Sequence, residues 1–114
     1  PFNTGRIMTD LRDDEDFAAL LAAAGDVPVV IDFWAPWCVP CKTMTPLAEA
    51  LAADFAESTH FVKVDIDAAP ELAARFGVRG VPTFLRLENG SETARLTGLT
   101  TRTRLAALFE GDAA

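Results

Sequence analysis

The chain has 114 residues, half of them hydrophobic, and a formal net charge of −7. This length fits one domain that can bury a core without disulfide staples, so its two cysteines are available for chemistry. The negative charge argues against nucleic acid or an anionic membrane as a partner, and its plainest meaning is solubility. No apolar run approaches the roughly 18 residues of a membrane span.

The two ends of the chain carry little patterning. We interpret residues 1–114 as a single domain, with a loose tail at 1–5. The tail is too short and too polar to be a signal peptide. Because the chain begins with Pro1 rather than Met, the removal of an upstream targeting segment stays open. Residues 6–8 fit a short edge strand.

The first half of the chain alternates helices and strands. Acids at 13–16 suit the start of a helix, and Gly25 suits its end. The almost continuous apolar run 28–34 indicates a strand that is buried on both faces, as in a parallel sheet. A second helix is predicted over 39–56, with a kink at Pro46. The inward-facing residues predicted for these two helices are Phe17, Leu20, Leu21, Ala24, Met44, Leu47, Ala48, Leu51 and Phe55.

The second half predicts a strand at 61–66, a short helix at 70–77 and a strand at 84–88. Asn89-Gly90 is a strong signal for a two-residue hairpin, which would return the chain as an antiparallel strand at 93–96. Gly98 breaks that strand.

A last helix completes the predicted order, capped by Thr100 or Thr101, with Leu105, Leu108 and Phe109 on one face. Parallel crossovers come first and a hairpin last. This order predicts a mixed sheet with helices on both faces.

Both cysteines lie three residues apart at a predicted strand–helix junction. With Cys38 at the N-cap, Val39 is N1, Pro40 is N2 and Cys41 is N3. Pro40 has no N–H, so the Cys41 N–H is the natural donor to the Cys38 sulfur. This hydrogen bond and the helix dipole both stabilise a thiolate, so we expect a lowered pKa for Cys38. Cys41, one turn inside, is expected to be more buried.

This arrangement predicts reversible disulfide chemistry. Cys38 attacks a substrate disulfide to form a mixed disulfide, and Cys41 then attacks Cys38 and releases reduced substrate. One alternative is a pair of inert core cysteines. Another is zinc, but a structural zinc site needs about four ligands, and the chain has two cysteines and one histidine. His60 is expected to be exposed, and no metal is predicted.

Asp32 is unusual because it is an acid within a buried apolar strand, which is costly unless it has a partner. Its side chain could simply reach an edge or a backbone donor. In the functional interpretation, which we favour, it lies under the dithiol with a raised pKa and takes the proton of Cys41 during resolution. Lys63, in the next parallel strand, is the expected cation near it.

Five stretches in register make a specific pattern: residues 30–35, 37–42, 64–67, 76–83 and 88–90. With them, the chain resembles the thioredoxin family over about residues 13–110. The resemblance implies an α/β thioredoxin fold, with a central mixed sheet of about five strands flanked by about four helices.

The resemblance also implies roles for single residues. Asp32 matches the family's buried acid and Lys63 its companion lysine. Pro82 matches a proline that is cis in the family and faces the dithiol, and the backbone of Val81 would pair with the substrate chain. The flat apolar patch around the cysteines would consist of Trp37, Val81, Pro82 and Gly98.

The implied activity is the reduction of protein disulfides, with electrons from a flavin-dependent thioredoxin reductase. No cofactor is implied beyond the Cys38–Cys41 disulfide. We expect a cytoplasmic monomer, although the cysteines do not fix the compartment, because their partner sets their redox state.

One residue departs from the family pattern: Val39 replaces the usual glycine between cysteine and proline. A β-branched residue stiffens the turn, and Val39 and Pro40 both influence the balance of dithiol and disulfide. A neutral, exposed valine is the alternative. Two rival functions therefore stay open. The first is a disulfide oxidant or isomerase, which a raised reduction potential would indicate. The second is a binding subunit with incidental redox activity, which full binding after replacement of both cysteines by serine would indicate.

Overall fold

The computed structural model describes residues 9–111, so the predicted tail at 1–5 and the predicted strand at 6–8 lie outside the described residues. The strands are β1 (Thr9–Asp10), β2 (Val29–Trp34), β3 (His60–Asp65), β4 (Thr83–Glu88) and β5 (Ser91–Thr97). The helices are α1 (Asp14–Ala24), α2 (Val39–Asp54), α3 (Pro70–Arg75) and α4 (Arg102–Glu110).

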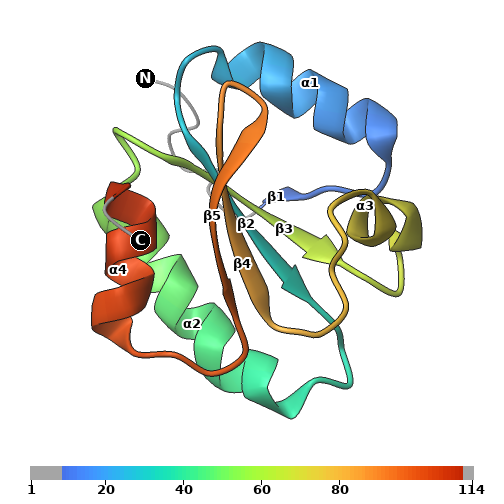
Figure 1. Cartoon of the computed structure of the whole chain (residues 1–114), viewed down its shortest axis with the longest axis vertical. Helices are drawn as coiled ribbons and strands as arrows, with labels where there is room; N and C mark the ends of the chain where they lie inside the picture. The colour runs from blue at the N-terminus through green and yellow to red at the C-terminus, as the bar shows by residue number, and fades with distance from the viewer. Residues whose placement is uncertain (1–8, 112–114) are drawn as a thin grey trace.

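The five strands form one mixed sheet in the order β1-β3-β2-β4-β5. β3 is parallel to β1 and β2, whereas β4 is antiparallel to β2 and β5. Figure 1 shows α1 and α3 on one side of the sheet and α2 and α4 on the other. The predicted α/β architecture, with crossovers first and a hairpin last, is confirmed.

Alternation along β2 divides the core into two halves. Val29, Ile31 and Phe33 pack with α1 and α3, whereas Val30 packs with α2 and α4. Successive side chains of a strand point to opposite faces, so Asp32 faces the same side as Val30. The strand is buried on both faces, as predicted, and its acid is directed towards α2.

The helix boundaries follow from local capping. The Asp13 side chain accepts a hydrogen bond from the Asp16 N–H at 2.8 Å, and Gly25, at φ 56°, follows the last residue of α1. Of the two caps considered for α4, Thr101 is the one used, and its hydroxyl accepts from the Arg104 N–H at 3.1 Å. Helix starts and ends are thus set largely by side chains within a few residues.

The hairpin extends further than predicted. Asn89 and Gly90 both have positive φ, which suits a two-residue turn, and Glu88 then pairs directly with Ser91. β5 therefore begins two residues before the predicted start.

The prediction that His60 is exposed is wrong. β3 begins at His60, whose N–H donates to the Pro28 carbonyl at 2.8 Å, and the residue is buried. The strand starts one residue earlier than the apolar pattern indicated, so His60 is part of the sheet and is buried there. Burial lowers the pKa of His60 to about 4.

Arg86 connects the sheet to the end of α4. It is buried in β4, and its guanidinium donates to the carbonyls of Leu108 at 3.0 Å and Phe109 at 2.7 Å. Its Nε also donates to Glu88 at 2.8 Å. The last carbonyls of a helix lack donors within the helix, and here Arg86 of β4 donates hydrogen bonds to two of them.

Candidate active site

The two cysteines form a disulfide at the start of α2, with their Cα atoms 5.3 Å apart. Cys38 is the N-cap, and its sulfur accepts a hydrogen bond from the Cys41 N–H at 3.1 Å. This contact was predicted from the missing N–H of Pro40 and is confirmed. The N-terminal end of α2 therefore directs a backbone donor and its positive dipole at the Cys38 sulfur.

Cys41 is no more buried than Cys38, so that prediction is wrong. Each residue is 3% exposed. The reason is that both pack with Ala35 in one small cluster, against which Trp34, Ile66 and Val81 also lie.

Apolar side chains surround the disulfide at the surface. Trp37 is 63% exposed and Val39 71% exposed, and both are next to Cys38 in the chain. The Trp37 indole N–H donates to the Asp67 carboxylate at 2.9 Å, which fixes the ring.

The predicted residues from the second half of the chain meet near the cysteines. The Val81–Pro82 peptide bond is cis, as the resemblance implied. Val81 packs against the cysteine cluster, and the Gly98 N–H donates to the Pro82 carbonyl at 2.8 Å. Gly98 has φ 83°, a conformation that favours glycine.

Asp32 is fully buried, and its partner is a side chain rather than the edge or backbone donor considered above. The Thr45 hydroxyl of α2 donates to Asp32 Oδ2 at 2.9 Å. Burial raises the pKa of Asp32 from its ordinary value of 3.8 to about 7, against the opposing effects of this hydrogen bond and of Lys63. The acid is thus poised to gain or lose a proton near neutral pH.

Lys63 lies beside Asp32, as predicted, because the two residues are register partners in β2 and β3. Its ammonium lies 3.4 Å from Glu49 Oε2 and 4.9 Å from the centre of the Trp34 ring. Glu49 was not predicted. Its signal was its spacing, since it lies eight residues after Cys41, on the same face of α2.

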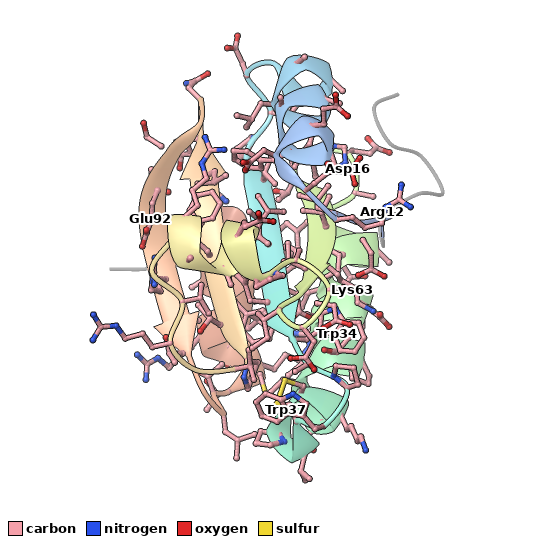
Figure 2. The ribbon with its side chains drawn as sticks, turned by 90° about the vertical axis from the view of Figure 1, so that its right-hand side faces the viewer. Arg12, Asp16, Trp34, Trp37, Lys63 and Glu92 are labelled. Carbon is pink, nitrogen blue, oxygen red and sulfur yellow. A yellow bond between two sulfur atoms is a disulfide. The ribbon has the colours of Figure 1, made fainter. Side chains whose placement is uncertain are left out.

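A pocket of about 280 Å³ opens beside the disulfide. Its lining includes Trp34, Pro36, Cys41, Lys42, Thr45 and Lys63. Cys41 therefore shares one pocket with Thr45, which contacts Asp32, and with Lys63, which is the register partner of Asp32. Figure 2 shows Trp34 and Lys63 on the same side of the molecule, above Trp37 and the disulfide.

Comparison with known proteins agrees with this geometry. The thioredoxin family model matches residues 8–110. A thioredoxin of Haemophilus influenzae is 40% identical over 94 residues, which cover 82% of this chain and 87% of that protein. The crystal structure of Fasciola hepatica thioredoxin superposes with a TM-score of 0.85 at 33% identity, over 92% of this chain and 99% of that one.

The chain belongs to the thioredoxin family. It is a thiol-disulfide oxidoreductase that works through its own Cys38–Cys41 disulfide. Similarity extends to the chloroplastic thioredoxin M4 of Arabidopsis thaliana, 40% identical over 103 residues, or 90% of this chain and 52% of that protein. A bacterial and a chloroplastic thioredoxin thus have the same percentage identity to this chain.

Within residues 9–111 of this thioredoxin, no group of three or more His, Cys, Asp or Glu side chains is arranged to hold a metal ion. In the same part of the chain, no helix is both long and apolar enough to cross a membrane.

Proposed function

We propose that Cys38 is the attacking cysteine and Cys41 the resolving one in the reduction of protein disulfides. The observation that carries this assignment is the hydrogen bond from the Cys41 N–H to the Cys38 sulfur at the N-terminus of α2. A thiolate at Cys38 would keep this donor and the helix dipole, both of which favour its charged form. Cys41 is not the N-cap, so its sulfur lacks this capping position.

Asp32 acts as the general base that takes the Cys41 proton. The support is a buried carboxyl whose pKa is raised to about 7, on the face of β2 that is directed towards α2. A base is most effective when its pKa is near the working pH. Lys63 assists by favouring the ionised form of Asp32 through its charge.

The protein substrate binds over the apolar surface formed by Trp37, Val81, Pro82 and Gly98. The exposed ring of Trp37 would contact it, and the half-buried Val81 would offer its backbone for strand-like pairing. Of the two residues between the cysteines, Pro40 tunes the potential, whereas the side chain of Val39 is exposed and has little effect on it.

The electron donor is a flavin-dependent thioredoxin reductase, and the working form is a monomer in the cytoplasm. Family membership supports the reductase. A coupled assay tests it: NADPH oxidation by such a reductase should depend on this protein, and Val39→Gly should serve as well as the native chain. Sedimentation of the reduced and oxidised protein tests the monomer, and location of the labelled protein in its native cell tests the compartment.

The assignment of the two cysteines is tested by trapping. Cys41→Ser should accumulate a covalent complex with a disulfide-containing protein, released by dithiothreitol, whereas Cys38→Ser should not. Accumulation by Cys38→Ser instead would reverse the two roles.

A further inference from the structure

Thr45 makes a contact that its position in a helix does not require. A threonine inside a helix commonly donates to the carbonyl four residues earlier. Thr45 donates instead across to β2, to Asp32 Oδ2 at 2.9 Å. Asp32 Oδ1 has no hydrogen-bond partner among residues 9–111. The hydroxyl therefore holds one carboxylate oxygen and leaves the other available.

Thr45 contacts this carboxylate and lies in the same helix as Cys41. Cys41 and Thr45 are four residues apart on α2, which places them on one face, about 6 Å apart along the helix axis. Both line the 280 Å³ pocket. Thr45 is half-buried, so its oxygen can accept a hydrogen bond from solvent in the pocket while its O–H donates to Asp32.

The other groups around Asp32 are charged in opposing ways. Lys63 of β3 favours its ionised form, whereas Glu49 of α2 and Asp10 of β1 disfavour it. From β4, its register partner is the uncharged Phe84. Lys63 is itself paired with Glu49, so the Thr45 hydroxyl is the direct donor that stabilises the carboxylate.

We propose that Thr45, one helical turn after Cys41, is a positioning residue for the resolving step, because its hydroxyl orients Asp32 and favours its ionised form. The inference rests on the proposed role of Asp32 as the base. Asp32 Oδ1 accepts the proton of the Cys41 thiol, and Cys41 Sγ forms its bond to Cys38 Sγ. The bond between Cys38 and the substrate sulfur breaks, its electron pair leaves with the substrate thiolate, and Asp32 later returns the proton to solvent.

The test separates attack from resolution in time. Reduced protein is mixed with dithiobis(nitrobenzoate), which releases one thionitrobenzoate when Cys38 attacks and a second when Cys41 resolves. Both rates are followed in a stopped-flow instrument from about pH 5 to pH 9. The variants are Thr45→Val, which keeps the shape without the hydroxyl, Thr45→Ser, which keeps the hydroxyl, and Thr43→Val, a matched exposed control on the same helix.

Loss of the hydroxyl should raise the midpoint of the resolution profile by about one pH unit, the order expected for a hydrogen bond to a charged group. At pH 7, Thr45→Val should then resolve about five-fold more slowly, while the first release is unchanged. Thr45→Ser and Thr43→Val should follow the native profile. Equal slowing of Thr45→Val at every pH would mean a structural role only and would overturn the inference.

The variant Asp32→Asn separates the proposed role of Thr45 from the proposed role of Asp32 as the general base. If Asp32 is the base, Asp32→Asn should abolish the midpoint, and Thr45→Val should then have no further effect on the profile. If Asp32→Asn abolishes the midpoint but Thr45→Val alone does not move it, the role of Thr45 fails and that of Asp32 stands. A native profile in Asp32→Asn would overturn both.

Discussion

Asp32 carries its charge between a sheet and a helix, where ionisation works against the fold. Its pKa in the folded chain is raised from 3.8 to about 7, so between these values the folded state holds a proton that the unfolded state has lost. Stability conferred by the protonated acid is therefore lost as the pH rises from about 4 through 7. Above pH 7 the cost of the buried charge is on the order of 4 kcal/mol.

Asp32→Asn should therefore raise the free energy of unfolding by up to about 4 kcal/mol at pH 8 and by little near pH 4, because the amide never ionises. Urea unfolding of the oxidised protein at both pH values measures this difference. Asp26→Asn, at an exposed position, is the control and should change neither value by more than about 0.5 kcal/mol. An equal effect of Asp32→Asn at both pH values would contradict the raised pKa.

Val39 lies in the turn between the cysteines, but its side chain is 71% exposed. Exposure favours the neutral interpretation of this departure from the family pattern. We therefore expect Val39→Gly to shift the reduction potential by less than about 30 mV, or about 1.4 kcal/mol. Equilibration of both proteins with one reference dithiol measures the shift, and a larger one would show that the stiffness of the turn sets the potential.

At the scale of elements, α4 is attached to the sheet by a strand side chain. Arg86 reaches two of its last carbonyls, and the Thr59 hydroxyl donates to Phe109 O at 3.2 Å as well. Arg86→Met should lower the free energy of unfolding by about 2–3 kcal/mol, because buried carbonyls lose charged donors. Arg102→Met removes an exposed ion pair of α4 with Asp54 at 3.5 Å and should cost less than about 1 kcal/mol. Equal losses in the two variants, compared by urea unfolding, would contradict this account.

Elements were predictable where the signal is local. Asn89-Gly90 predicts its own turn, and the missing N–H of Pro40 predicts the donor to Cys38, because both effects act within three residues. The contacts of Arg86 and Thr45 were not predicted, because their partners come from other elements of the fold. A sequence pattern indicates which face a residue takes, but not which polar atom it meets there.

At the scale of the molecule, two buried ionisable groups oppose each other. His60 has its pKa lowered from 6.5 to about 4, so its contribution to stability is complete above pH 6.5 and is lost as the pH falls towards 4. Asp32 acts in the opposite direction between about pH 4 and pH 7. The two slopes largely cancel between pH 4 and pH 6.5.

Replacement of either residue should reveal the pH dependence of stability that the other one causes. The stability of His60→Gln should fall as the pH rises from about 4.5 to 6.5, and that of Asp32→Asn should rise over the same range, relative to the native chain. Thermal or urea unfolding at several pH values gives both slopes. Parallel curves for the two variants would contradict the opposed shifts.

The whole fold serves one dithiol, held where β2 ends and α2 begins, and the central claim is that this dithiol reduces protein disulfides. The most direct test is the reduction potential of Cys38–Cys41, measured by equilibration with a glutathione or reference-dithiol couple. We expect a value near the general figure for thioredoxins, about −270 mV, which this structure does not itself yield. A value of about −180 mV or higher would instead place the protein with disulfide isomerases and oxidants, and would contradict the account.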